Sequence, residues 1–98
     1  MSANYRLTPR AAEDLDAIAD YTIDTWGLDQ LESYLRSLDS RFEWLAENPL
    51  AGRERNDVHR GYRCFPEASH VIFYVVSGDH VDIIGIPHKS MDIGPHLF

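Results

Sequence analysis

The sequence has one cysteine and no long apolar run, and each shortage excludes a class of protein. Because Cys64 is the only cysteine, no internal disulfide bond can form, which is typical of a protein from a reducing compartment. No segment approaches the roughly 18 consecutive apolar residues of a membrane-spanning helix. The first residues, MSANYRLTPRAAEDL, have no apolar stretch of the kind found in secretion signals. We therefore expect a soluble, cytoplasmic protein that does not contact a membrane.

Basic residues are scarce, and they are unevenly distributed. The 98 residues include nine lysines and arginines against 16 aspartates and glutamates, which gives a formal net charge of −7. Residues 11–48 hold ten acidic and two basic residues, a net charge of −8, and the remainder has a net charge of +1. Phosphate repulsion disfavours sequence-specific nucleic-acid binding by the acidic part. The arginine-rich segment 53–63 is where an acidic partner or RNA could dock.

The short motifs of many common enzyme classes are missing from the sequence. It contains no GxSxG, no P-loop and no GxGxxG. Cys64 could pair with His70 or His88 as a thiolate nucleophile. It lies within a strand pattern, however, where a small buried thiol is the commoner role. The sequence therefore predicts no catalytic residue of these kinds.

The C-terminal stretch PHKSMDIGPHLF, residues 87–98, raises the question of a metal site. His88, Asp92 and His96 are four residues apart, so on a continuous helix their side chains would share one face. Gly94-Pro95 interrupts that helix, and no further nitrogen or thiolate ligand is close in the sequence. We therefore expect neither a metal nor a cofactor.

Two consecutive helices are predicted in the acidic half. Thr8 can cap the first helix, Pro9 is tolerated in its first turn, and Gly27 suits a left-handed cap at its end. A second helix is expected over residues 28–46, ended by Asn48-Pro49. Its apolar residues recur at steps of three and four, which indicates a core-facing seam: Leu28, Leu31, Leu35, Leu38, Phe42 and Leu45. The many acidic side chains of both helices are expected to point outward into solvent.

The remainder of the chain has the alternation of β-structure. An opening strand is predicted over residues 4–7, and a polar loop over residues 49–60. Strands are then expected at 61–65, 70–76 and 81–86, joined by turns at 66–69 and 77–79. The predicted fold is of the α+β class: an N-terminal strand and an antiparallel helical hairpin packed on a C-terminal antiparallel meander. The whole chain, residues 1–98, is expected to form one domain.

One catalytic constellation stays open from the residues alone, which is metal-free cleavage of RNA. Such a nuclease needs a base, an acid and cations around the strained phosphate. Arg53, Arg55 and Arg63 could supply the cations, and His88 could act as acid or base near neutral pH.

Several short motifs in order resemble one family over nearly the whole chain. These are AAEDLDAIADYT, WG, FEWLAENPLAGR, GYR, SHVIFYVV, VDIIGIPH and MDIGPHL. In this order they are similar to ParE, the toxin of type II toxin–antitoxin modules in the RelE/ParE superfamily. The resemblance implies the RelE/ParE-like fold and a non-enzymatic toxin that poisons DNA gyrase. It also implies neutralisation by a ParD-like antitoxin in a hetero-oligomer.

Two alternatives stand beside this expectation. One is a ribosome-dependent mRNA endoribonuclease of the RelE type, and the other is a non-toxic relative that only binds antitoxin. Against the nuclease, His88 is followed by Lys89 rather than by the tyrosine of a Glu/His/Tyr set. The acidic charge balance also departs from that of the basic ribosome-binding nucleases.

The resemblance suggests candidate residues for two surfaces. The C-terminal end of ParE-like toxins is implicated in toxicity, which makes five residues target-binding candidates: His88, Met91, Asp92, His96 and Leu97. Alternatively, Met91, Ile93, Leu97 and Phe98 pack back on the sheet while the histidines bond local carbonyl groups.

The antitoxin is expected to fold over an apolar groove flanked by cations. Trp26, Tyr34 and Trp44 would add apolar surface to it. Arg53, Arg60 and Arg63 would pair with carboxylates of the antitoxin, and Tyr62 and Tyr74 are expected to line the groove.

Overall fold

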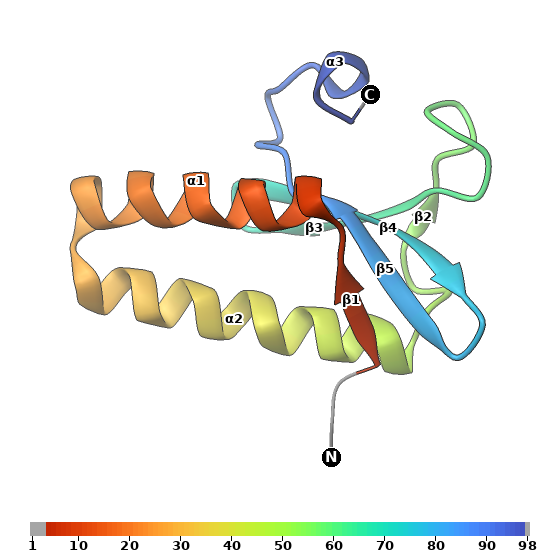
Figure 1. Ribbon diagram of the computed structural model, residues 1–98, viewed down its shortest axis with the longest axis horizontal. Coiled ribbons are helices and arrows are strands. Elements are labelled where there is room, and N and C mark those ends of the chain that lie inside the picture. The colour runs from red at the N-terminus through yellow and green to blue at the C-terminus, as the bar shows by residue number, and fades with distance from the viewer. Residues whose placement is uncertain (1–3, 98) are drawn as a thin grey trace.

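The computed structural model describes residues 4–97, without the side chain of Pro95, and shows a helical hairpin beside a mixed five-stranded sheet (Figure 1). The elements in chain order are β1 (Tyr5–Leu7), α1 (Pro9–Trp26), α2 (Leu28–Glu47), β2 (Arg53–Glu54), β3 (Arg63–Glu67), β4 (His70–Ser77), β5 (His80–Gly85) and α3 (Ile93–Leu97). The strand order in the sheet is β1-β5-β4-β3-β2. The α+β class and the order of strand, helical hairpin and meander are therefore confirmed.

The two long helices begin and end close to the predicted positions. The hydroxyl of Thr8 accepts a hydrogen bond from the backbone N–H of Ala11 at 3.2 Å, as an N-cap should. Gly27 has a φ of +93°, which glycine adopts without a steric penalty, and its N–H bonds the carbonyl oxygens of Thr22 and Ile23. The reversal at Gly27 therefore needs a single residue between the helices. None of the helices in residues 4–97 is both long enough and apolar enough to cross a membrane.

The core lies between the hairpin and one face of the sheet. From α2 it includes Leu38, Phe42 and Leu45, which pack with Ile72 and Ile83 of the sheet among other buried residues. The predicted core seam is wrong at Leu28 and Leu35, which are 57% and 37% exposed, whereas Leu31 between them is half-buried. Figure 1 shows the reason: the helix ends that meet at Gly27 project past the strands and have no sheet beneath them.

The sheet is larger than the predicted meander. Strands β3, β4 and β5 pair antiparallel as expected, but β1 adds a parallel pairing to β5, with Tyr5 opposite Val81. Strand β2, inside the segment predicted as a loop, pairs with β3 at Arg53 and Cys64. The β2–β3 pairing is antiparallel, so the parallel pairing of β1 with β5 is what makes the sheet mixed.

The predicted turn at residues 66–69 is also partly wrong. Pro66 and Glu67 belong to β3 and pair with β4, and only Ala68 and Ser69 form the turn. Ala68 has a φ of +54°, the left-handed conformation that a two-residue hairpin turn demands. Pro66 is accommodated because it lies beyond the part of β3 that pairs with β2.

Candidate binding groove

A groove of about 580 Å³ lies between α1, the turn from β3 to β4, and the C-terminal segment. We call it the tail groove, and its lining residues are Asp14, Ala17, Ile18, Tyr21, Thr22, Trp26, Gln30, Tyr34, Ala68, Ser69, His70, Ile86, His88, Met91 and His96. Among these described lining residues there is no lysine or arginine. The groove combines apolar walls with histidine, tyrosine and aspartate side chains, so it can both bury apolar groups and form hydrogen bonds.

His70, the first residue of β4, is held in the groove by Tyr34 of α2. The Tyr34 hydroxyl lies 2.8 Å from Nδ1 of His70 and 3.3 Å from the carbonyl oxygen of Glu67. Burial, reinforced by the charge of Glu67, raises the pKa of Tyr34 to about 12. The pKa of His70 is lowered, first by burial and then by His88, while Asp14 opposes the shift. Near neutral pH this pairing suits a tyrosine hydroxyl that donates to a neutral histidine.

The C-terminal segment runs beside the start of β4 before it reaches α3. The Val71 N–H donates to the carbonyl oxygen of Pro87 at 2.9 Å, and the Lys89 N–H donates to that of Ser69 at 2.8 Å. These bonds place His88 opposite His70, with ring centroids 5.5 Å apart in an edge-on arrangement. The backbone hydrogen bonds therefore fix residues 87–89 beside the start of β4.

Asp14 is the residue that the sequence prediction misplaced most. It was expected to face solvent with the other acidic residues of α1, but it is only 7% exposed. Its Oδ2 atom accepts a hydrogen bond from the Ile86 N–H at 2.8 Å and lies 2.9 Å from Nε2 of His96. The spacing of four residues from Asp14 to Ile18 and on to Thr22 puts Asp14 on the buried face of α1, and this signal could have identified it.

The five target-binding candidates divide into two groups. His88, Met91 and Asp92 are exposed, whereas His96 and Leu97 are half-buried in α3. Because α3 begins at Ile93, His88 and Asp92 lie before it and do not share a helical face with His96. No three His, Cys, Asp or Glu side chains come together as metal ligands within residues 4–97.

The alternative of packing against the sheet holds for part of the segment. Ile93 and Leu97 are half-buried, Met91 is exposed, and Phe98 lies outside the described residues. The histidines bond side chains rather than carbonyl groups: Nδ1 of His88 lies 2.8 Å from the Ser90 hydroxyl, and His96 contacts Asp14.

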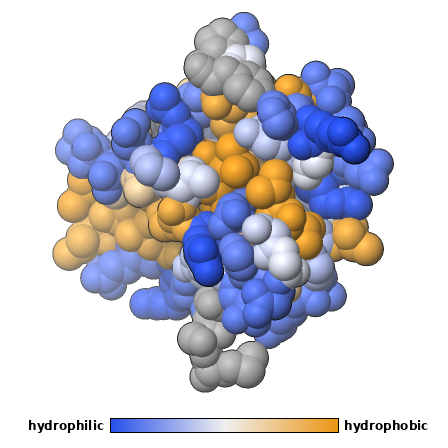
Figure 2. Space-filling view, turned by 45° about the vertical axis from the view of Figure 1, so that its right-hand side comes forward, coloured by the Kyte–Doolittle hydropathy of each residue, from blue (hydrophilic) through white to orange (hydrophobic). Residues whose placement is uncertain are grey.

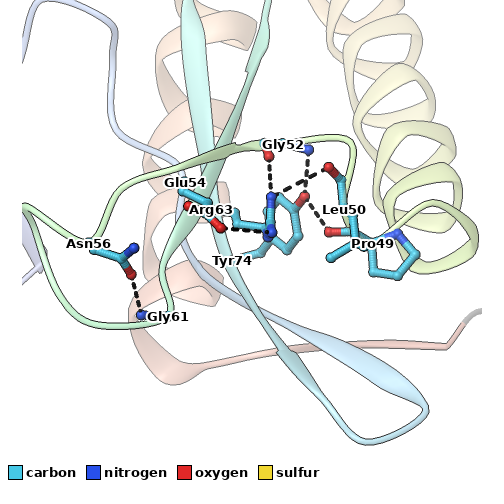
Figure 3. Close-up of polar contacts among 8 residues, drawn as sticks. All are labelled: Pro49, Leu50, Gly52, Glu54, Asn56, Gly61, Arg63 and Tyr74. Carbon is cyan, nitrogen blue, oxygen red and sulfur yellow. Dashed lines mark hydrogen bonds and ion pairs between the residues drawn. The ribbon is translucent and has the colours of Figure 1, made fainter.

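Arg63 and Tyr74, two of the antitoxin-binding candidates, instead hold the segment after α2 (Figure 3). The Arg63 guanidinium donates to the carbonyl oxygen of Gly52 at 2.7 Å and lies 3.4 Å from Oε1 of Glu54. The Tyr74 hydroxyl donates to the carbonyl oxygen of Pro49 and accepts from the Gly52 N–H, each at 2.8 Å. Tyr74 is fully buried, so the expectation that its side chain lines a surface groove is wrong.

The other candidates on the arginine-rich segment remain at the surface. Arg53 and Arg60 are exposed, and Tyr62 is half-buried with its ring 4.9 Å from that of His59. Asn56 accepts a hydrogen bond from the Gly61 N–H at 2.9 Å and so shapes the loop between them. The structure therefore presents two of the three candidate arginines, Arg53 and Arg60, to a partner.

The aromatic candidates occupy different environments. Trp44 is 37% exposed and packs on Phe65, with ring centroids 5.2 Å apart, beneath the guanidinium of Arg41. Trp26 is 69% exposed at the end of α1 and borders the tail groove. Tyr21, Ile23 and Leu28 also expose large apolar side chains near the end of the hairpin, and we call these three residues and Trp26 the hairpin patch. Figure 2 shows hydrophobic surface on the left-hand side, towards which the hairpin projects.

Comparison with known sequences identifies relatives over nearly the full length. A family model described as ParE toxin of type II toxin–antitoxin system, parDE, matches residues 5–93. Toxin ParE1 of Mycobacterium tuberculosis (strain ATCC 25618 / H37Rv) is 40% identical over 98 residues, which cover 99% of this chain and 100% of that protein. Toxin ParE1 of Caulobacter vibrioides is 42% identical over 93 residues, which cover 95% of this chain and 96% of that protein.

Comparison with solved structures gives the same fold. A chain of the chromosomal ParDE system from P. aeruginosa superposes with a TM-score of 0.74. The match covers 88% of this chain and 95% of that chain, at 23% sequence identity. At this identity the likeness concerns the fold alone, and it agrees with the arrangement of hairpin and sheet described above.

Proposed function

Because the chain belongs to the ParE toxin family of type II toxin–antitoxin systems, we propose that it arrests growth by binding DNA gyrase. It acts in the cytoplasm by binding rather than by catalysis. A ParD-like antitoxin neutralises it in a hetero-oligomer. The observation that carries the proposal is the exposed segment 88–92, which lies beside a groove with apolar walls.

The charge of the site supports a protein target over RNA. The described lining of the tail groove contains no lysine or arginine, and the chain as a whole has a net charge of −7. An RNA phosphate in the groove would find no guanidinium or ammonium among these lining residues to offset its charge. A protein surface with apolar side chains and hydrogen-bonding groups suits the groove better.

The hairpin patch supports an obligate protein partner. Its four side chains are between 42% and 69% exposed. A domain of this size depends on burying its large apolar side chains for stability, so their exposure indicates a binding surface. An antitoxin segment that folds over the toxin would cover this patch, and Arg53 and Arg60 are exposed to pair with its carboxylates. We therefore assign neutralisation to the hairpin patch together with the exposed arginines, and target binding to the C-terminal segment.

A supercoiling and cleavage assay with purified gyrase, ATP and the chain freed from antitoxin tests the proposal. We expect inhibited supercoiling or accumulation of cleaved DNA, reversed by the antitoxin. Full gyrase activity at saturating concentrations of folded chain would reject the target. If induction in cells without antitoxin also caused no growth arrest, the chain would be a relative that only binds antitoxin.

A second candidate function is ribosome-dependent cleavage of mRNA. It is favoured by the Tyr34, His70 and His88 side chains, because two histidines and a tyrosine in one groove could transfer protons. Incubation in a translating extract, with primer extension to map the mRNA ends, separates it from the first proposal. Cleavage that disappears in both His70→Gln and His88→Gln would establish the nuclease, and intact mRNA with excess chain would exclude it.

A further inference from the structure

A single carboxylate oxygen in the interior joins three segments that are distant in the sequence. Oδ2 of Asp14, in α1, accepts from the Ile86 N–H at 2.8 Å, directly after β5. The same atom lies 2.9 Å from Nε2 of His96, in α3. A carboxylate oxygen offers only lone pairs, so the His96 nitrogen is the donor. Asp14 therefore connects α3 to the body of the molecule.

The neighbouring contact on β5 belongs to the same arrangement. A Cβ atom added to Gly85 would lie 2.6 Å from Cδ2 of Leu97, 3.3 Å from Oδ2 of Asp14 and 3.7 Å from Cγ of Arg10. Real Cβ atoms do not approach other heavy atoms as closely as the first of these distances. Because glycine has no side chain, Gly85 leaves the space that the Leu97 side chain occupies. Asp14 holds the adjacent His96.

We propose that Asp14 is a positioning residue for the C-terminal segment, which anchors α3 so that the exposed residues before it are presented to the target. This inference rests on the proposed function, which assigns target binding to that segment. His88 is fixed by the backbone ladder beside β4, and the Asp14–His96 pair with the Leu97 contact fixes the other end. Met91 and Asp92 are thereby held between two attachments.

Burial distinguishes Asp14 from the residues of the segment itself. At 7% exposure, its side chain cannot reach a target surface, so an effect of its substitution on toxicity has to act through the groups that it holds. His96 and Leu97 could contribute to target binding directly as well as through the anchor. Asp14 and Gly85 are therefore the positions that isolate anchoring.

The test is hydrogen exchange of residues 93–97, combined with growth arrest in cells that lack the antitoxin. Asp14→Ala removes the anchor, whereas in Asp14→Asn an amide oxygen can occupy the place of Oδ2 and accept both hydrogen bonds. Gly85→Ala keeps the Asp14 carboxylate in the chain but displaces Leu97 and crowds Oδ2 of Asp14, which would lie 3.3 Å from the new Cβ atom. Asp16→Ala, an exposed acidic position on the same helix, is the matched control. Antitoxin affinity, measured for each variant, reports whether the hairpin and sheet are intact.

We expect exchange at residues 93–97 to become about tenfold faster or more in Asp14→Ala, the scale of one lost charge-assisted hydrogen bond. Gly85→Ala should accelerate the same amides, and both variants should lose growth arrest. Asp14→Asn should recover most of both properties, and Asp16→Ala should match the unmodified chain.

Equal exchange at these amides in Asp14→Ala and Asp16→Ala would overturn the anchor. Faster exchange with undiminished growth arrest would overturn its role in presenting the segment. Should Asp14→Ala fail to fold, Gly85→Ala decides in the same way. If the unmodified chain itself causes no growth arrest, the proposed function fails instead, and the exchange measurement still decides whether Asp14 anchors α3.

Discussion

His70 lies between a tyrosine that needs an acceptor and a second histidine that disfavours another positive charge. Its Nδ1 atom is 2.8 Å from the Tyr34 hydroxyl, and the ring of His88 is 5.5 Å away. Burial is the main reason why the pKa of His70 falls below its ordinary value of 6.5, and the charge of His88 adds to this effect. Asp14 acts in the opposite direction. The native state therefore favours neutral His70.

This shift predicts a pH dependence of stability with a definite sign. Below pH 6.5 the unfolded chain binds a proton at His70 more readily than the native chain, so the free energy of unfolding falls as the pH decreases towards the native pKa. Above that window the contribution is fully present. His70→Gln keeps an acceptor for Tyr34 but does not titrate, so it should lose this part of the decline.

Urea unfolding at pH 7.5 and at pH 5 measures the effect in both chains. His59→Gln, at an exposed position on the loop before β3, is the control and should keep the decline of the unmodified chain. An equal decline in His70→Gln and the unmodified chain would show that His70 contributes nothing to the acid sensitivity.

Individual residues were harder to place from the sequence than the elements that carry them. Asp14 and Tyr74 are both buried, and each bonds groups far away in the chain: Asp14 the Ile86 N–H and His96, and Tyr74 the Pro49 carbonyl. Periodicity shows which face of a helix is buried, but not which distant backbone group will meet a polar side chain there. The spacing of Asp14, Ile18 and Thr22 could have shown that Asp14 is buried, but no local pattern encodes the tertiary hydrogen bonds that Asp14 and Tyr74 form.

Elements with a long periodic pattern were predicted well, whereas of the short elements β1 was predicted but β2 and α3 were not. α1 and α2 have strong end signals at Thr8, Gly27 and Asn48, and their observed bounds agree with the prediction. β2 has two residues, too few for any alternation, and its pairing with β3 depends on Arg63 and Tyr74 fixing the segment before it. The parallel pairing of β1 joins the two ends of the chain, which local patterns do not reveal.

The hairpin patch yields a prediction about the helical element that carries it. Trp26→Ala should weaken binding of the antitoxin by about tenfold or more, since truncation of a central interface tryptophan commonly costs over 1 kcal/mol. Stability of the free chain should change by less than about 0.5 kcal/mol, because Trp26 is 69% exposed. Titration calorimetry and urea unfolding measure the two quantities.

Val76→Ala is the matched control for this substitution. Val76 is 43% exposed on β4, close to the β4–β5 turn and away from the turn that joins α1 to α2 (Figure 1). Its truncation should leave antitoxin affinity unchanged. Equal affinities of Trp26→Ala and the unmodified chain would remove the hairpin patch from the antitoxin interface.

For the whole molecule, the separation of charge is the property that decides which macromolecule it can approach. The helical half, residues 11–48, has a net charge of −8, and the remainder has a net charge of +1. The exposed arginines Arg53, in β2, and Arg60, in the loop after β2, lie outside the tail groove, which has no arginine or lysine among its described lining residues. Any attraction to DNA would therefore act at a surface other than the groove.

We predict that the chain alone does not bind duplex DNA and that it reaches a DNA–gyrase complex through the gyrase protein. Fluorescence anisotropy with a labelled duplex should show no binding up to about 10 µM chain in about 0.1 M salt, where basic proteins bind non-specifically. Cross-linking in a complex of gyrase, DNA and the chain should label gyrase subunits. Two results would contradict this prediction: cross-links mainly to DNA, or duplex binding that weakens steeply with added salt. Either would show that the residues outside 11–48, with a net charge of +1, can bind DNA phosphates. The arginine-rich loop would then be a target-binding surface, and its assignment to the antitoxin would have to be abandoned.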